Sequence, residues 1–226
     1  MHTTAIIPAF EEAATIGAVV DVARASPLVD EVLVVDGDSG DDTVERASEH
    51  GAKVLVEPRP GKGEAMLTGV KATDAEVIVF LDADLTGLRP AHVDRLVRTV
   101  TAGGALMSCG LFDRGPMANL VWLHFLPILT GERAMRRELF ESLDADDITG
   151  YRVEAALNAR AAELGGPVGA FICAGMFHRT KEDKFDDPLR GFLAKVQMIL
   201  TALGSYVRYW THRRIRGLRR TTTADG

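Results

Sequence analysis

Cysteine is scarce in this chain, with only Cys109 and Cys173 among 226 residues. The two lie far apart and have neither the spacing of a metal-binding pair nor that of a redox-active pair. We therefore expect both to be buried free thiols in a reducing compartment.

Long uncharged apolar runs are also missing. The nearest, residues 120–129, contains Pro127 and falls short of the ~18–20 residues that a membrane span needs. The N-terminus has no basic region followed by a long apolar stretch, so we expect no signal peptide. Together these features predict a cytoplasmic protein.

The chain has no excess of positive charge. Its formal net charge is −6 and its pI is about 5.5, which argues against a polyanion binder and predicts no nucleic-acid partner. The sign is uneven, however, because the stretch "RYWTHRRIRGLRR" near the C-terminus carries six arginines. This asymmetry predicts a local basic contact surface.

The first half alternates between two kinds of pattern. Apolar runs typical of strands cover residues 4–10, 31–36, 52–58 and 76–84, and helical patterns cover residues 11–26, 41–51, 62–73 and 90–104. This alternation predicts an α/β fold with a mostly parallel sheet and helices on both faces. Right-handed crossovers bring the carboxyl ends of the strands to one edge, where such sheets bind ligands.

The second half is less regular. It predicts strands at 105–113 and 167–178, and helices at 131–143, 151–165 and 189–210. With no internal repeat or linker, we expect one domain over residues 1–187. Residues 188–226 then form a C-terminal arm, an amphipathic helix followed by a basic tail.

Two carboxylates, Asp82 and Asp84, end the strongly apolar run "VIVFLDADL". Neighbouring negative charges at a strand end repel each other unless a cation lies beside them. A hard divalent ion such as Mg²⁺ or Mn²⁺ suits these oxygens and commonly brings substrate phosphates with it. The alternative is a polar loop with two solvated aspartates, and the strand context favours the metal.

The stretch "PGKGEA" places Lys62 between two glycines at a predicted helix start. Helix N-termini attract anions and a lysine adds positive charge, but an ordinary helix-start turn explains the pattern equally well. The spacing of a phosphate-binding P-loop is absent. Asp36 ends the second predicted strand and has no capping role, so we expect it to be free for a ligand.

Four stretches, "IIPAFEEAATIG", "VVDGDSGDDT", "GKGEAMLTGV" and "VIVFLDADL", resemble the family 2 glycosyltransferases with the Rossmann-like GT-A fold. Within that superfamily the sequence looks most like the glucosyl-3-phosphoglycerate synthase group, a resemblance carried by "PGKGEA", "GERAMRREL", "GYRVEAAL" and "FHR". It is also similar to the dolichyl-phosphate mannose synthase group. The resemblance spans roughly residues 3 to 180. It implies a metal-dependent hexosyltransferase that moves a sugar from a UDP- or GDP-sugar to a small anionic or polyprenyl-phosphate acceptor.

The resemblance also implies roles for single residues. It implies that the nucleoside is held by Pro8, Ala9, Glu11 and Asp36. It also implies that Lys62 and Gly63 lie near the base and the phosphates. The Asp82-Ala83-Asp84 segment holds ribose, sugar and metal, with Asp84 and His178 as metal ligands. Gly131 and Arg133 shape the acceptor and phosphate side, Tyr151 and Glu154 face the donor sugar, and Arg179 meets an anionic acceptor.

Catalysis requires stabilisation of the negative charge that develops on the departing diphosphate. A divalent cation, with Lys62 or Arg133 nearby, is the candidate for this role. An inverting enzyme also needs a carboxylate base, Glu154 or Asp147, whereas a retaining one does not. Both outcomes stay open. The sequence departs from the family pattern at Asp36-Gly37-Asp38-Ser39. The family's usual run here is Asp-Asp-Gly-Ser or Asp-Ser-Gly-Ser, so the acidic and glycine positions are exchanged.

Two other functions compete with glycosyl transfer. A sugar-phosphate nucleotidyltransferase opens with a Gly-rich loop ending in arginine, which "PAFEEAATIG" lacks. A catalytically silent GT-A binding module is the second, and the intact Asp82, Asp84 and His178 argue against it.

The acceptor side leaves two alternatives. A small anionic acid would use Arg179 and Lys181. A polyprenyl phosphate would use residues 120–129 and the C-terminal helix in a peripheral contact with the inner membrane face. That helix equally suits packing on the domain or on a second subunit of a homodimer.

Overall fold

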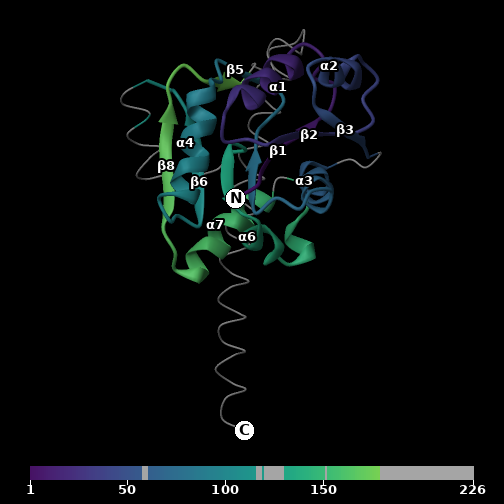
Figure 1. Ribbon diagram of the computed structural model, residues 1–226. Coiled ribbons are helices and arrows are strands. Elements are labelled where there is room, and N and C mark those ends of the chain that lie inside the picture. The colour runs from purple at the N-terminus through teal and green to yellow at the C-terminus, as the bar shows by residue number, and fades with distance from the viewer. Residues whose placement is uncertain (58–60, 116–118, 120–129, 151, 179–226) are drawn as a thin grey trace, which may run out of the picture. The chain divides into compact units, whose positions relative to one another are not determined.

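The computed structural model describes residues 1–57, 61–115, 119, 130–150 and 152–178, and for His178 it describes the backbone only (Figure 1). The chain divides into two units, Met1–Arg179 and Thr180–Gly226. The second unit, the predicted C-terminal arm at 188–226 and the apolar segment 120–129 lie outside the described residues. The predicted boundary at residue 187 therefore stays a prediction.

A seven-stranded sheet with the order β3-β2-β1-β4-β7-β6-β8 forms the centre of the first unit. Its strands are β1 (Thr3–Ala9), β2 (Glu31–Asp36), β3 (Lys53–Val56), β4 (Val77–Phe80), β6 (Met107–Phe112), β7 (Arg133–Arg136) and β8 (Val168–Cys173). Strand β7 runs antiparallel to both β4 and β6, and the other pairs are parallel. The predicted mostly parallel α/β sheet is confirmed.

Helices cover both faces of this sheet, as predicted. They are α1 (Ile16–Ala25), α2 (Thr43–Glu49), α3 (Lys62–Lys71), α4 (Pro90–Thr101), α6 (Arg137–Glu141) and α7 (Arg152–Leu164), with a short 3₁₀ turn at Ala145–Asp147. None of the helices in the described part of the chain is long and apolar enough to cross a membrane.

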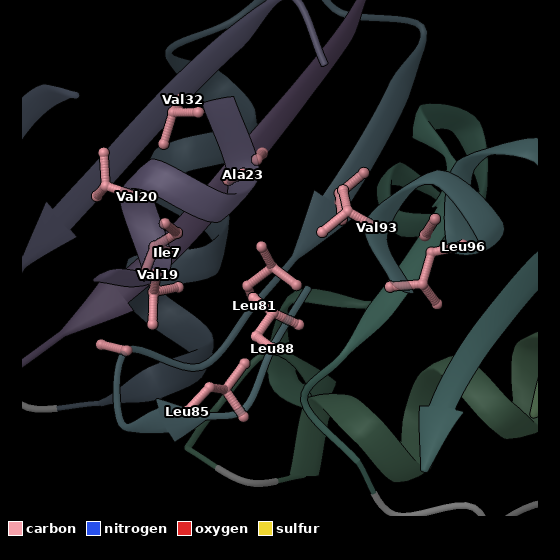
Figure 2. Packing of buried hydrophobic residues seen from close by; sticks show 14 of the residues in the cluster. Ile7, Val19, Val20, Ala23, Val32, Leu81, Leu85, Leu88, Val93 and Leu96 are labelled. Carbon is pink, nitrogen blue, oxygen red and sulfur yellow. The ribbon is translucent and has the colours of Figure 1, made fainter. Parts of the chain in front are cut away.

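Alternation along the strands divides the core into two clusters. On β1, Ala5 and Ile7 face one cluster, to which α1 and α4 contribute Val19, Val93 and Leu96 (Figure 2). Ile6 faces the other cluster, with residues of α3, α6 and α7. Because successive side chains of a strand point to opposite faces, one apolar strand supplies both layers.

The predicted helix over 131–143 is wrong in its first part. Residues 133–136 form β7, and only Arg137–Glu141 is helical. Ala134 and Met135 are fully buried between β4 and β6, where Ala134 lies opposite both Val79 and Ser108. Pairing with two strands outweighs the helical preference of this sequence, which is a weak local bias.

The single strand predicted over 167–178 is divided in two. A turn at Ala174 and Gly175, with Gly175 at φ 76°, separates β8 from β9 (Phe177–His178). Strand β9 leaves the main sheet and pairs with β5 (Leu85–Thr86) in a small second sheet. The sequence signal for this break is the glycine, which adopts a positive φ without steric cost.

Candidate functional site

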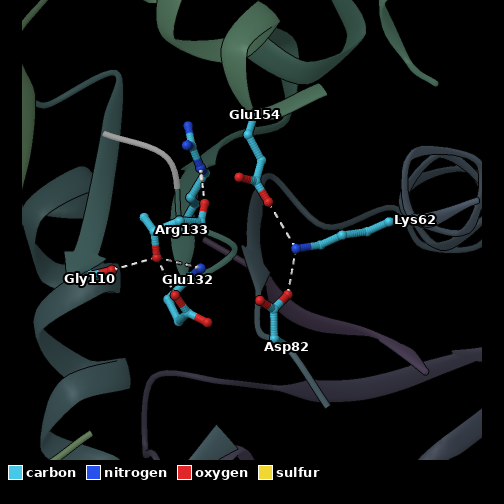
Figure 3. Close-up of polar contacts among 7 residues, drawn as sticks. Lys62, Asp82, Gly110, Glu132, Arg133 and Glu154 are labelled. Carbon is cyan, nitrogen blue, oxygen red and sulfur yellow. Dashed lines mark hydrogen bonds and ion pairs between the residues drawn. The ribbon is translucent and has the colours of Figure 1, made fainter. Parts of the chain in front are cut away.

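Three charged side chains from distant parts of the chain meet at the carboxyl edge of β4. Lys62 begins α3, Asp82 follows the end of β4, and Glu154 lies in the first turn of α7. The Nζ of Lys62 lies 2.6 Å from Asp82 Oδ1 and 2.9 Å from Glu154 Oε1 (Figure 3). The structure thus brings together three of the site residues that the sequence predicts.

Lys62 is held as a cation by this arrangement. Burial alone would lower its pKa, but the negative charges of Asp82 and then Glu154 outweigh burial and raise the pKa of Lys62 above its ordinary value. The exposed fractions of the three side chains are only 18% for Lys62, 16% for Asp82 and 11% for Glu154. Poor access of water keeps their mutual attraction strong.

Two glycines let the backbone come close to this cluster. A Cβ on Gly131 would overlap the Asp82 carboxylate, and a Cβ on Gly63 would lie 3.0 Å from the main chain at Ile148 and Thr149. The glycines are therefore needed for close approach. Gly131 places the segment before β7 against Asp82, and Gly63 seats the start of α3 against the segment before α7.

Asp36, at the carboxyl end of β2, is engaged within the chain and not free as expected. Its Oδ1 accepts a 2.6 Å bond from Ser39 Oγ and its Oδ2 a 2.8 Å bond from Ser39 N. Ser39 Oγ in turn accepts a bond from Glu11 N. Asp36 thus ties the loops after β1 and β2 together, and its predicted nucleoside contact stays a prediction.

Both of these loops contain a non-glycine residue with positive φ, Glu11 at 55° and Asp38 at 68°. Such conformations are costly outside glycine and cluster at ligand sites. Pro8 and Ala9 end β1 beside these loops, Pro8 half-buried and Ala9 buried. The loops therefore give the edge of the sheet a defined shape.

Arg133 lies differently from the expectation that it contacts phosphate. The residue is fully buried, with Nε donating to Thr130 O at 2.6 Å and a terminal nitrogen donating to Asn158 Oδ1 at 2.8 Å. Because it has no exposed surface, we interpret it as a residue that orients the Thr130–Glu132 segment relative to α7. Figure 3 shows Arg133 beside Glu132 in this segment.

Sequence reasoning missed the inner polar residues of this region. Thr130 Oγ1 donates to Gly110 O at 2.7 Å and contacts the buried carboxylate of Glu132. Asn158 follows Glu154 by one helical turn, so the two share a face of α7. The other inward residues of α7 are apolar. The polar pair Glu154 and Asn158 was therefore the sequence signal that could have indicated this inner polar region.

The predicted metal ligands come from segments that pair in the fold. In the β5–β9 ladder Leu85, the residue after Asp84, lies opposite His178. The backbones of Asp84 and His178 are thus brought together, while ligation by the His178 ring stays a prediction. Among the described residues no group of three or more His, Cys, Asp or Glu side chains is placed to hold a metal ion. Tyr151 and Arg179 lie outside the described residues, and Ala83 is buried.

Comparison with known proteins assigns the family. Residues 4–159 match the model of glycosyl transferase family 2. The chain belongs to this family. Membership decides against the nucleotidyltransferase alternative, and it places the described site within the matched region of a family 2 domain.

Among curated relatives of this family 2 domain, the glucosyl-3-phosphoglycerate synthase of Mycobacterium tuberculosis is 39% identical over 124 residues, which cover 50% of this chain and 38% of the relative. An uncharacterized glycosyltransferase of Mycobacterium bovis is 32% identical over 179 residues, covering 70% of this chain and 79% of the relative. The match thus spans well under half the length of the synthase.

Solved structures resemble the family 2 domain over most of its length. The M. tuberculosis synthase in complex with Mg²⁺ and uridine diphosphate aligns with a TM-score of 0.73 and 30% identity, covering 91% of this chain and 79% of that one. The same synthase with Mn²⁺, uridine diphosphate and glucosyl-3-phosphoglycerate aligns with a TM-score of 0.72. The predicted GT-A fold is confirmed.

Proposed function

We propose that this domain transfers a sugar from a UDP-sugar to a small phosphorylated acid, with Mg²⁺ or Mn²⁺ as cofactor. The observation that carries the proposal is the convergence of Lys62, Asp82 and Glu154 at the carboxyl edge of β4, where Asp82 lies two residues before Asp84. The solved M. tuberculosis synthase binds UDP with Mg²⁺, and in another complex it holds Mn²⁺, UDP-glucose and phosphoglyceric acid.

The residues near Asp84 fit a divalent cation that arrives with a diphosphate. Mg²⁺ and Mn²⁺ sites of this kind use one or two protein carboxylates, with substrate phosphates and water completing the shell. The half-buried Asp84 provides one carboxylate, and His178 is the proposed second ligand. A bound cation would stabilise the charge that develops on the leaving diphosphate.

Glu154 fits a role in positioning the donor sugar better than a role as base. Its carboxylate already accepts a bond from Lys62 Nζ. If Glu154 took up a proton, its negative charge would be lost and Lys62 would keep only Asp82 as a charged partner in a poorly solvated site, which is unfavourable. This arrangement supports a mechanism in which Glu154 and Lys62 orient donor groups and Asp82 keeps Lys62 in place.

The acceptor assignment draws on the relatives' chemistry and on Arg179 and Lys181 in the sequence, since acidic acceptors call for cationic partners. A polyprenyl-phosphate acceptor depends on residues 120–129 and 189–210, which lie outside the described residues. Membrane contact and dimerisation through the C-terminal helix therefore stay predictions.

A direct assay tests the proposal. The purified chain is incubated with UDP-glucose, 3-phosphoglycerate and Mn²⁺, and the glycosylated acid is measured by mass spectrometry. GDP-glucose and glycerol 3-phosphate serve as alternative substrates. We expect product with UDP-glucose and loss of most of it in Asp84→Asn, whereas Asp74→Asn, an exposed aspartate after α3, keeps wild-type activity.

Nucleotide binding gives a second measurement. A ligand present at about 100 times its dissociation constant stabilises the fold by roughly 2.7 kcal/mol. For a domain of this size that raises the melting temperature by roughly 5–10 °C. If UDP produces this shift only with Mn²⁺ and no sugar is transferred, the chain is a binding module. If neither UDP nor GDP shifts the transition, the proposed function is wrong.

A further inference from the structure

The β5–β9 ladder that brings His178 beside the residue after Asp84 is very short. Each strand has two residues, Leu85 opposite His178 and Thr86 opposite Phe177, and the Thr86 hydroxyl donates to Phe177 O at 3.2 Å. So few pairs are marginal by themselves. Contacts elsewhere must therefore decide where β9 lies, and they gather at the turn of residues 174–176 that precedes it.

Arg89 holds this turn from the start of α4. Its guanidinium donates to Ala174 O at 2.6 Å and lies 3.2 Å from His92 Nε2, one helical turn along α4. A residue before proline is confined to extended backbone, and Arg89 has φ −135° and ψ 151° ahead of Pro90. The side chain thus extends from a fixed point on a helix whose inner face is buried in the core.

Gly87 and Asp113 hold the same turn from two other sides. A Cβ on Gly87, whose φ is 69°, would overlap Gly175 O, so the turn lies directly against the Gly87 backbone. Asp113 Oδ2 accepts a bond from Gly175 N at 3.3 Å, and Asp113 N donates to Met176 O at 3.3 Å. The turn is therefore attached to β5, to α4 and to the end of β6.

We propose that Arg89 and Gly87 are positioning residues of the metal site. They hold turn 174–176 so that β9 pairs with β5 and His178 comes beside Asp84. The inference rests on the proposed function in one respect, that His178 is a ligand of the divalent cation. It adds two residues whose role is to position the turn before His178.

Two variants test the proposal, each with a matched control. Arg89→Ala removes the bond to Ala174 O, and Arg98→Ala removes an exposed arginine of the same helix. Gly87→Ala introduces the overlap with Gly175 O, and Gly104→Ala places a methyl at the same φ of 69° with nothing within 4 Å. Backbone strain is thus matched between the two glycine variants, and only the contact differs.

The measured quantities are the dissociation constant of Mn²⁺ in the presence of UDP, from the paramagnetic resonance signal of free Mn²⁺, and the affinity for UDP in chelator. Loss of a residue that orients a metal ligand typically weakens metal binding roughly 10- to 100-fold. We expect a loss in this range for Arg89→Ala and Gly87→Ala, unchanged metal-free UDP binding, and wild-type behaviour in both controls.

A double variant shows whether Arg89 acts through the histidine. If it does, adding Arg89→Ala to His178→Ala weakens Mn²⁺ binding no further than His178→Ala alone, because coupled residues are not additive. Wild-type Mn²⁺ binding in Arg89→Ala and Gly87→Ala would overturn the inference and leave the proposed function standing. An equal loss of metal-free UDP binding would also overturn it. If the wild-type chain binds no Mn²⁺ with UDP, both fail.

Discussion

Replacement of Lys62 by methionine is the sharpest test of the charged cluster. Methionine keeps much of the length and apolar volume of the lysine side chain but removes the ammonium group that lies between Asp82 and Glu154. The two carboxylates then remain in a poorly solvated site without their cation. We expect a large loss of stability because an unpaired buried charge is among the most destabilising changes in a protein.

The magnitude follows from the geometry. At contact distances of 2.6 and 2.9 Å and an effective dielectric constant of about 20, each contact is worth about 6 kcal/mol of Coulomb attraction. Desolvation of the ions offsets much of this, and removal of one partner of such a pair costs about 3–5 kcal/mol. For a chain of this length that lowers the melting temperature by roughly 6–20 °C.

Thermal and urea unfolding at pH 7 measure the effect. Lys71→Met, an exposed lysine at the other end of α3, is the control and should change stability by less than about 0.5 kcal/mol. The deficit of Lys62→Met should shrink as the pH falls, because protonation of either carboxylate relieves their repulsion. Adding Glu154→Gln to Lys62→Met should likewise recover part of the loss. Equal melting temperatures for Lys62→Met and Lys71→Met would refute the reasoning.

Three further predictions concern single sites. Gly131→Ala should displace the Asp82 carboxylate and destabilise the fold by about 1–3 kcal/mol. Gly40→Ala, with nothing within 4 Å, should not, and equal unfolding curves for the two would contradict this. Burial, and secondarily the charge of the neighbouring arginine, lowers the pKa of His92 below 6.5. Its contribution to stability is therefore full above about pH 6.5 and is lost as the pH falls toward the folded-state pKa. His92→Gln should flatten this acid-side decline in urea midpoints. Burial raises the pKa of Cys173 to about 12, so native protein should resist alkylation by iodoacetamide at pH 8, and rapid labelling would count against it.

Both cysteines are buried and unpaired, in agreement with the expectation from their spacing. Localisation in the cytoplasm is a separate matter and stays a prediction, as does the acceptor.

Local pattern was sufficient for the first half of the fold. The apolar runs of β1 and β2 and the proline that begins α4 each act within a few residues. A strand that is apolar on both faces requires a covering layer on each side, so the sandwich of helices around a parallel sheet follows from those runs. The position of Asp82 and Asp84 at the ligand edge follows in turn from the direction of β4.

Only the tertiary structure decided the remainder. Residues 133–136 form a strand because they pair with both β4 and β6. Local helix or strand preference does not encode such pairing with distant strands. Lys62 pairs with Asp82 after β4 and with Glu154 on α7. The buried Arg133 donates to Asn158 of the same helix. Such pairings are set by contacts between residues far apart in sequence. The sequence by itself therefore determined the layers and the chemical types at the edge of the sheet, and the packing of distant elements determined which charges neutralise one another there.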